Sequence, residues 1–301
     1  MRYRGRFAPT PSGPLHAGSL LTALAGFLQA RASGGDWLLR IDDLDMARCR
    51  VEHRDTILRQ LEAHALHWDE SPRLQSEHQA AYSEAFTILQ HRAQLYACAC
   101  TRAELAVSSQ SGPDGPLYAG TCRERALNQQ NRAIRLRLEP KTLAIDDRCQ
   151  GRLERRLAED VGDFVVRRAD GQIAYQLACV VDEQAQRITE VVRGSDLIGS
   201  SLKQRYLQQV LDVVQPDYLH IPILLDAQGR KLSKQNHARA LDSAGASDNL
   251  RQALVALGQS PPPTLADASP GEILQWAIPA WRVDRIPRVD RLNSSGLSEA
   301  W

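Results

Sequence analysis

The sequence predicts an α/β fold built around a doubly wound, parallel sheet of the Rossmann type. An irregular insertion interrupts the sheet, and a short helical region follows toward the C-terminal end. Three observations support this prediction. The chain opens with a strand, a Pro/Gly-rich loop, a helix and a second strand, the order that begins a doubly wound sheet. Residues 96–125 then lose hydrophobic periodicity and are rich in Cys, Gly, Ser and Pro. From residue 238 onward the pattern is helical, apart from three consecutive prolines.

The first 95 residues contain alternating strands and helices. Trp37–Ile41 is interpreted as a continuous apolar strand, as expected where helices cover both faces of a sheet. Ser76 followed by Gln79 matches a capping box, which starts a helix. In order, the expected elements are a strand Arg4–Ala8, a helix ending at Gly34-Gly35, a strand Trp37–Ile41, a helix Val51–Leu66 and a helix from Ser76 through Leu95.

The second half returns to the α/β pattern after the irregular stretch. Asp170-Gly171 is a hairpin signal between two apolar runs. The expected elements are strands Ala133–Leu138, Asp163–Arg168 and Ile188–Val192, a helix from Asp196 through Val214, and a strand Tyr218–Leu225.

Composition limits the possible functions. A chain of 301 residues with 43% hydrophobic residues is ordinary for a soluble globular protein. No apolar run approaches the roughly 18 residues that cross a bilayer, and the basic N-terminus lacks an apolar signal segment. We therefore expect a cytoplasmic protein without membrane contact. The net charge of +1 gives no argument for nucleic acid. Two stretches are rich in arginine, Arg123–Arg137 and Arg282–Arg291. Each is either a local patch that binds RNA or solvated surface.

Two loops over 200 residues apart are suited to phosphate. The first, Pro11–Ser19, follows a strand and opens a helix, so its backbone N–H groups face an anion. Gly13 and Gly18 allow close approach, and His16 either donates to a phosphate oxygen or is structural. The second loop, Lys231–Lys234, holds two of only four lysines in the chain. A flexible ammonium group suits a moving pyrophosphate.

These loops belong to a set of four motifs that resembles the class I glutamyl-tRNA synthetases. Residues 6–19, Arg-Phe-Ala-Pro-Thr-Pro-Ser-Gly-Pro-Leu-His-Ala-Gly-Ser, resemble the family's N-terminal motif, and residues 231–235, Lys-Leu-Ser-Lys-Gln, its second, mobile-loop motif. Residues 39–45 are similar to the family's Leu-Arg-Ile-Glu-Asp-x-Asp, and Tyr175 with residues 191–197 matches its substrate-binding Tyr and Arg. The resemblance covers about the first 240 residues and implies the class I synthetase fold.

The resemblance implies a role for each motif residue. The implied catalytic residues are His16, Lys231 and Lys234. The implied ATP-binding residues, with Mg²⁺ accompanying the nucleotide, are Pro9, Gly13, His16, Gly18, Ser19 and Lys234. The implied glutamate-binding residues are Arg6, Phe7, Ala8, Pro9, Thr10, Asp42, Tyr175 and Arg193.

Simple charge pairing agrees with these glutamate-binding roles. L-Glutamate has two carboxylates and one ammonium group, so its site needs guanidinium groups and a carboxylate. Arg6 and Arg193 supply the first, and Asp42 the second. The structural alternative is that Arg193 and Asp42 form an ion pair at strand ends. Asp42 also departs from the family, which has Glu there, so its shorter side chain needs a closer loop or a bridging water.

Three cysteines fall within 25 positions of the irregular stretch and point to a metal. Structural zinc takes four ligands, and the segment between Cys100 and Cys122 contains no His. The fourth ligand is then an Asp, a distant His or water; the resemblance suggests Tyr118, as in the zinc-bearing insertion of glutamyl-queuosine tRNA(Asp) synthetases. The expected set for one structural Zn²⁺ is Cys98, Cys100, Tyr118 and Cys122. The alternative is three reduced cysteines in a loop.

The expected domain organisation follows from these assignments. Residues 1–95 and 161–237 form the two halves of the catalytic domain, 96–160 the zinc-containing insertion and 238–301 a helical stem. Only 67 residues follow Lys234, too few for a separate anticodon-binding domain. The chain therefore resembles the truncated paralogue family, the glutamyl-queuosine tRNA(Asp) synthetases.

That family's reaction is the function we expect. It implies ATP-dependent formation of glutamyl-adenylate and transfer to queuosine at the wobble position of tRNA(Asp), with the anticodon loop as partner. We expect a monomer. Two alternatives remain open: a nucleotidylyltransferase with another acceptor, and a non-catalytic, zinc-stabilised RNA-binding paralogue.

Overall fold

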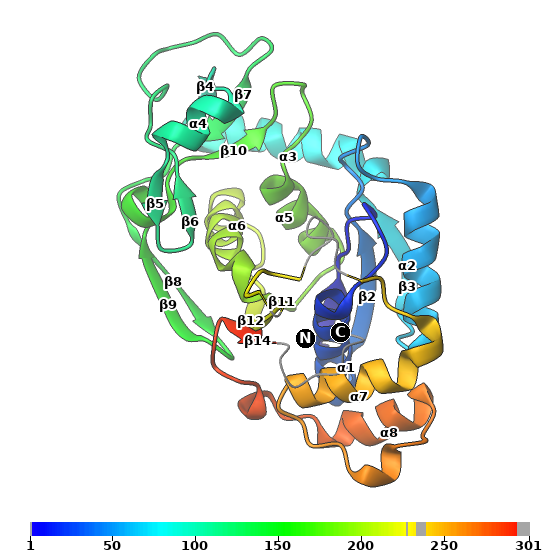
Figure 1. Cartoon of the computed structure of the whole chain (residues 1–301). Coiled ribbons are helices and arrows are strands. Elements are labelled where there is room, and N and C mark those ends of the chain that lie inside the picture. The colour runs from blue at the N-terminus through cyan, green and yellow to red at the C-terminus, as the bar shows by residue number, and fades with distance from the viewer. Residues whose placement is uncertain (1, 227, 233–238, 294–301) are drawn as a thin grey trace.

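A largely parallel sheet forms the centre of the protein (Figure 1). The computed structural model describes residues 2–226, 228–232 and 239–293. One ladder contains the parallel strands β1 (Arg4–Phe7), β2 (Asp36–Ile41) and β3 (Asp69–Leu74). The other contains the parallel strands β11 (Glu190–Gly194), β12 (Asp217–Ile221) and β8 (Thr142–Asp147), with the antiparallel edge strand β9 (Gly151–Arg156). The predicted α/β fold with a parallel sheet is confirmed.

The two ladders meet at β1 and β11. The Thr189 backbone N–H donates to the Arg4 carbonyl oxygen at 2.9 Å, which joins the two strands edge to edge. From this line, β2 and β3 extend to one side and β12 and β8 to the other. A sheet whose strand order reverses in this way opens a crevice at the carboxyl ends of the two central strands. Any ligand site of this fold is expected there.

Helices cover both faces of the sheet and create two hydrophobic cores. Residues along β2 alternate between them, since Trp37 and Leu39 belong to the first core and Leu38 to the second. The first core contains α1 (Ala17–Ala32), α2 (Val51–Ala63), α7 (Ala246–Ala256) and α8 (Pro270–Ala280), with α7 and α8, in orange, beside α1 in Figure 1. The second contains α3 (Gln79–Arg92), α5 (Tyr175–Ala185) and α6 (Ile198–Leu211).

The segment predicted to be irregular has some regular structure. Its first strand, β4 (Leu95–Cys98), pairs with β7 (Ala133–Leu136), which also pairs with β10 (Phe164–Arg167) in an antiparallel sheet. Between β4 and β7 lie α4 (Arg102–Ser108), started by a Thr101/Glu104 capping box, and the hairpin of β5 (Gln110–Gly112) and β6 (Gly115–Leu117). This part is at the upper left of Figure 1. The predicted domain boundaries stay a prediction.

Two predicted element boundaries are wrong for local reasons. Ser76 does not cap α3; its backbone N–H and hydroxyl donate to Asp43 instead, and a 3₁₀ turn over Gln75–His78 precedes the helix. The predicted strand Tyr218–Leu225 is divided into β12 and β13 (Ile223–Leu225) at Pro222, which has no N–H to donate. The strand β13 then pairs with β14 (Arg291–Asn293). Among the described helices, none is long and apolar enough to cross a membrane.

A buried hydrogen-bonded chain ties β8, β12 and α6 together. Asp147 Oδ2 lies 2.6 Å from His220 Nδ1, and His220 Nε2 lies 2.7 Å from Ser201 Oγ. Catalytic triads show the same connectivity, but the side chains of His220 and Asp147 are fully buried and Ser201 is 0% exposed, so no substrate reaches them. This series of hydrogen bonds is therefore structural. Burial lowers the pKa of His220 despite the neighbouring Asp147 carboxylate.

Because the folded state holds His220 neutral, we predict that acid weakens the fold through this residue. On unfolding, His220 regains a pKa of about 6.5 and takes up a proton below that pH. The stabilisation of the folded state that depends on a neutral His220 is present above about pH 6.5 and is lost as the pH falls below that value. Between pH 7.5 and 5.5 the free energy of unfolding of the wild type should fall by about 1 kcal/mol more than that of His220→Gln. Urea unfolding at both pH values measures this difference, and identical pH dependence would contradict the prediction.

Candidate active site

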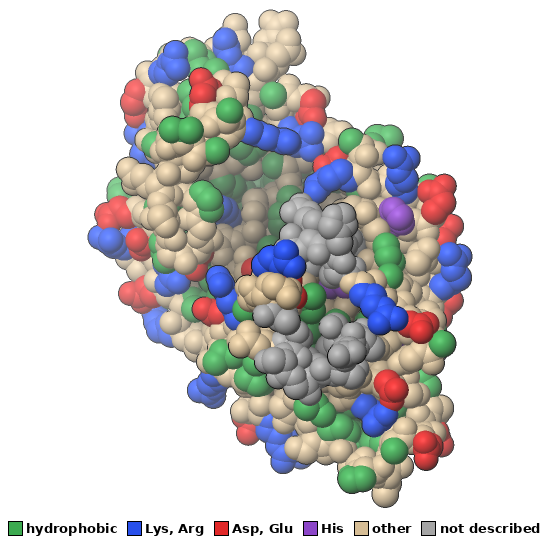
Figure 2. Space-filling view, in the orientation of Figure 1, with side chains coloured by type: hydrophobic (Ala, Val, Ile, Leu, Met, Phe, Trp, Pro, Cys, Tyr) green, Lys and Arg blue, Asp and Glu red, His purple; other side chains and the backbone are tan. Residues whose placement is uncertain are grey.

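A cavity of about 310 Å³ opens at the carboxyl ends of β1 and β11. The molecular surface is hollowed on this face, between the part around α4 and the part around α2 (Figure 2). Most of the predicted site residues line this cavity: Arg6, Phe7, Ala8, Pro9, Thr10, His16, Gly18, Ser19, Tyr175, Arg193 and Lys231. Gly13 and Asp42 are buried outside its lining. Lys234 lies outside the described residues.

His16 is the residue directly before α1 and caps that helix. Its Nδ1 accepts a hydrogen bond from the Ser19 backbone N–H at 3.3 Å, which caps the helix. A nitrogen that accepts carries no proton, so the ring proton is on Nε2, which is then a donor. The expected donor role of His16 is therefore compatible with its role as a helix cap.

The two predicted phosphate loops lie close together at the cavity. A Cβ atom on Gly18 would lie 3.2 Å from His16 Cε1 and 3.6 Å from the Leu232 carbonyl oxygen. Glycine therefore lets the first loop approach both the imidazole and the second loop. The Leu232 backbone N–H donates to the Leu224 carbonyl oxygen at 2.9 Å, which fixes the start of the second loop to β13.

Lys231 forms an ion pair with Asp196, to which the sequence motifs gave no role. Its Nζ lies 2.5 Å from Asp196 Oδ2, and both residues line the cavity. Asp196 follows directly on β11, in the 3₁₀ turn Ser195–Leu197. Its position just past the end of a central strand was the available signal, since such residues face the crevice of a doubly wound sheet.

Arg6 and Arg193 bring two buried guanidinium groups to the cavity. Arg6 lies on β1 and Arg193 on β11, and they are 5% and 3% exposed. Both donate to one oxygen, Glu183 Oε1: Arg6 from Nη2 at 3.0 Å and Arg193 from Nη2 at 3.3 Å. Burial lowers the pKa of Arg6. Burial would raise the pKa of Glu183, but Arg6, Arg193 and Arg40 together lower it.

Asp42 is paired within the protein. Its two carboxylate oxygens accept from Arg40, from Nε at 2.7 Å and from Nη2 at 3.3 Å, and Asp42 is 7% exposed. Burial raises the pKa of Asp42 in spite of this arginine. Arg193 pairs with Glu183, so Asp42 and Arg193 do not form the ion pair considered from the sequence. The contact of Asp42 with the substrate ammonium group stays a prediction.

Tyr175 is the first residue of α5, and its side chain reaches the cavity lining. With 39% of its surface exposed, it is one of the few large hydrophobic side chains open to solvent in the described chain. Cys179 and Glu183 follow one and two helical turns later on the same helix face. The α5 helix therefore places a cavity-lining phenol and a buried carboxylate beside the same group of arginines.

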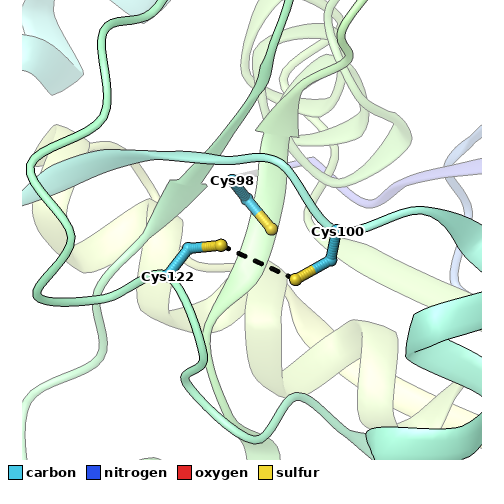
Figure 3. A group of neighbouring side chains, drawn as sticks. All are labelled: Cys98, Cys100 and Cys122. Atoms are coloured by element: carbon cyan, nitrogen blue, oxygen red, sulfur yellow. Dashed lines mark hydrogen bonds between the residues drawn. The ribbon is translucent and has the colours of Figure 1, made fainter.

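Three thiols form a compact group in the insertion (Figure 3). The sulfur atoms of Cys98, Cys100 and Cys122 lie within 4.8 Å of one another, with Cys100 and Cys122 at 3.6 Å. The Tyr118 hydroxyl lies 3.5 Å from Cys98 Sγ and 3.7 Å from Cys100 Sγ. A tetrahedral zinc ion with its usual bond lengths separates two sulfurs by about 3.8 Å, and a sulfur and an oxygen by about 3.5 Å. These residues therefore fit a zinc site.

Electrostatics differ between the members of this group. Burial raises the pKa of the Cys100 thiol to about 11. Burial would also raise the pKa of Cys122, but hydrogen bonds from the Ala99 backbone, Tyr118 and the other thiols lower it to about 7. The Arg135 guanidinium lies 3.7 Å from the centre of the Tyr118 ring and makes a cation–π contact with it, while burial and the neighbouring thiols raise the pKa of the Tyr118 hydroxyl.

The other cysteines and the first Arg-rich stretch have structural partners. Cys179 is fully buried and accepts from Arg40 Nη2 at 3.2 Å. Arg123 pairs with Asp163 at 2.7 Å, and Arg137 with Glu124 at 2.9 Å. These arginines of the first stretch are therefore committed to contacts within the protein.

The fold is that of a class I aminoacyl-tRNA synthetase catalytic domain. The family model described as "tRNA synthetases class I (E and Q), catalytic domain" matches residues 2–259. The fold is shared with a glutamate-tRNA synthetase from Elizabethkingia anophelis at a TM-score of 0.78 and 22% identity, covering 98% of this chain and 69% of that one. It is also shared with a glutamate tRNA ligase from Elizabethkingia meningosepticum, at a TM-score of 0.75 and 23% identity, over 97% and 67% of the two chains.

Curated relatives give a narrower assignment. The chain is 49% identical over 298 residues to the glutamyl-Q tRNA(Asp) synthetase of Methylococcus capsulatus, covering 98% of this chain and 97% of the relative. It is 48% identical to that of Thiobacillus denitrificans, over 94% of each chain. It is 44% identical to that of Pseudomonas aeruginosa strain PAO1, over 98% and 99%. The chain belongs to the class I tRNA synthetases of the glutamyl and glutaminyl type, in the glutamyl-Q tRNA(Asp) synthetase family.

Proposed function

We propose that this protein activates L-glutamate with ATP and transfers the glutamyl group to queuosine at the wobble position of tRNA(Asp). Identity of 44–49% to glutamyl-Q tRNA(Asp) synthetases over most of the chain is the observation that carries the proposal. The cavity supports it, since it combines guanidinium groups for a dicarboxylic amino acid with a helix N-terminus for phosphates.

In this proposal, Arg6 and Arg193 bind the carboxylates of glutamate. Tyr175 contributes one hydrogen bond, and residues 7–10 form the wall beside β1. Asp42 receives the ammonium group after a loop movement or through a water, because its oxygens already accept from Arg40. Buried guanidinium groups that are already in place cost little reorganisation when the substrate arrives.

ATP occupies the other part of the cavity, with its phosphates at the N-terminus of α1. There His16 Nε2 donates to phosphate, Pro9, Gly13, Gly18 and Ser19 form the loop around it, and Lys231 and Lys234 neutralise the charge that develops on pyrophosphate. Mg²⁺ accompanies ATP and is held chiefly by the phosphates. Asp196 is the acidic side chain of the described lining, and it already pairs with Lys231, so we assign no protein ligand to Mg²⁺.

The reaction needs positioning rather than a protein nucleophile. A carboxylate oxygen of glutamate attacks the α-phosphorus of ATP, forming glutamyl-adenylate as pyrophosphate leaves. A hydroxyl of queuosine then attacks the activated carbonyl, an ester forms, and AMP leaves. The anticodon loop suits such an acceptor because its bases are unstacked and accessible. That the protein acts as a monomer, in the cytoplasm, remains a prediction.

Pyrophosphate exchange tests this function directly. We predict that the protein, ATP and L-glutamate exchange labelled pyrophosphate into ATP, and that L-glutamine supports far less exchange. The protein should then attach labelled glutamate to tRNA(Asp) that contains queuosine, but not to the same tRNA with guanosine at that position. Exchange without charging would favour another acceptor. Absence of exchange, both alone and with tRNA, would favour a non-catalytic RNA-binding protein.

The two roles of His16 can be separated by a pair of substitutions. Asn caps helices well but does not place a donor at the position of Nε2, whereas Ala does neither. Both His16→Asn and His16→Ala should lower the exchange rate by about 10²–10³-fold. Only His16→Ala should also lower the free energy of unfolding, by about 1 kcal/mol. Exchange kinetics and urea unfolding measure the two effects, and full activity of His16→Asn would remove the phosphate role.

We also propose that Cys98, Cys100, Tyr118 and Cys122 hold one structural Zn²⁺. The separations of 3.6 Å between Cys100 Sγ and Cys122 Sγ and of 3.5 Å between the Tyr118 hydroxyl and Cys98 Sγ agree with a tetrahedral site. The ion would contribute cross-linking of the insertion and no chemistry at the cavity.

Metal analysis tests this assignment. We predict about one zinc per chain in freshly purified protein, and its loss in Cys122→Ala. Tyr118→Phe removes one ligand and should weaken zinc affinity, with proteolysis between residues 99 and 121 increasing first. Cys149→Ser is the matched control, because Cys149 is buried and contacts Pro287 and Gln150 rather than the thiol group. Metal-free protein, or equal zinc loss in the control, would contradict the site.

A further inference from the structure

We propose that Glu183 is a positioning residue for glutamate binding, holding Arg6 and Arg193 side by side so that both can receive the substrate. The inference rests on the proposed function, because it takes L-glutamate as the ligand of the two arginines. Glu183 itself is 2% exposed and lies outside the described lining of the cavity. It therefore acts through the arginines and not by contact with the reacting atoms.

The geometry around Glu183 is that of a shared acceptor. Its Oε1 accepts from Arg6 Nε at 3.2 Å, from Arg6 Nη2 at 3.0 Å and from Arg193 Nη2 at 3.3 Å. Each arginine makes one further hydrogen bond: Arg6 Nη1 donates to the Val192 carbonyl oxygen at 3.2 Å, and Arg193 Nη1 donates to Gln204 Oε1 at 2.8 Å. One carboxylate oxygen therefore sets the distance and relative orientation of two groups from different strands.

The arginines need such an acceptor because they repel each other. The positive charge of Arg193 contributes to lowering the pKa of Arg6, after burial itself. Both guanidinium groups are withdrawn from water, so a carboxylate between them offsets a repulsion that solvent does not screen. Without the negative charge, the two groups should separate or rotate away from the cavity.

Unsatisfied atoms are concentrated in the same cluster. The described residues contain nine buried side-chain nitrogen or oxygen atoms without a hydrogen-bond partner. Three of them are Glu183 Oε2, Arg193 Nε and Arg40 Nη1, which belong to one group of contacting residues. Buried polar groups are normally satisfied, so the hydrogen bonding within this cluster is incomplete. Arg193, one of the three residues, also lines the cavity.

The neighbouring carboxylate, Asp182, has a different task. It accepts from Arg73, Gln75 and Tyr82, none of which lines the cavity. Asp182 thus anchors α5 to β3 and α3, while Glu183 on the next position faces the substrate arginines. Asp182 Oδ2 also lies 3.8 Å from Arg40 Nε, so both acids contact that arginine, but only Glu183 accepts from Arg6 and Arg193.

Steady-state pyrophosphate exchange distinguishes positioning from a purely structural role. Glu183→Gln keeps the size and an oxygen acceptor but removes the charge. We expect KM for glutamate to rise about 10–100-fold, the range for losing hydrogen bonds to a charged group, with KM for ATP within about twofold of wild type. Glu183→Asp, which keeps the charge on a shorter side chain, should raise KM for glutamate less. This second variant provides the test if Glu183→Gln does not fold.

Glu190→Gln is the matched control. Glu190 is also 2% exposed and accepts from Tyr3 at 2.8 Å and Arg148 at 2.7 Å, neither of which lines the cavity. It should lose stability without a selective change in KM for glutamate. An unchanged KM for glutamate in Glu183→Gln, or equal rises for glutamate and ATP, would overturn the inference while wild-type exchange still supports the proposed function. A wild type that neither exchanges nor binds glutamate by calorimetry would remove both.

Discussion

The organisation of this protein depends on the burial of three arginines at the switch point of its sheet. Arg6, Arg40 and Arg193 come from β1, β2 and β11, and each is at most 5% exposed. Burying a guanidinium group is costly unless carboxylates compensate it. Asp42 and Glu183 supply two negative charges for these three positive ones. Asp182 contacts both Arg40, at 3.8 Å, and Arg73, at 2.7 Å, and this second pair adds one charge of each sign. The buried group of arginines and carboxylates therefore carries one positive charge more than negative charges. This excess is complementary to an amino acid of net charge −1.

The same strand ends explain how residues more than 200 positions apart form one site. The first phosphate loop leaves β1, and the second leaves β13, which continues β12 beyond Pro222. Both exit at the same edge of the sheet, and the Leu232 carbonyl oxygen reaches the space above Gly18. The pair Lys231–Asp196 adds an electrostatic link between the second loop and the end of β11. The part of the cavity that we propose for the nucleotide is therefore formed by the order of the strands, and its side chains add the specific contacts.

Sequence reasoning could predict the residues that follow strand ends but not their internal partners. Arg6, His16, Tyr175 and Arg193 were found because they belong to recognisable sequence motifs, and the cavity brings them together. Glu183 was missed because a helical carboxylate looks like solvated surface until tertiary packing buries it. The strand β3 was missed because its sequence, Asp-Glu-Ser-Pro-Arg-Leu, is polar, and its place is set by pairing with β2. The Ser76 capping box failed because Asp43, distant in sequence, offers its hydroxyl a charged acceptor.

The insertion has little hydrophobic core of its own, so a bound metal ion is a physically reasonable way to stabilise it. Its helix α4 buries no residue, Val107 is 89% exposed, and the β5–β6 hairpin has only polar, glycine and proline positions besides Leu117. Such a segment gains little from apolar burial, so chain entropy favours its unfolding. Cys98 ends a strand of the β4-β7-β10 sheet, whereas Tyr118 and Cys122 follow the hairpin. An ion bound by all of them would tie the hairpin to that sheet and close the loop between, which replaces the missing hydrophobic contacts by a few strong bonds.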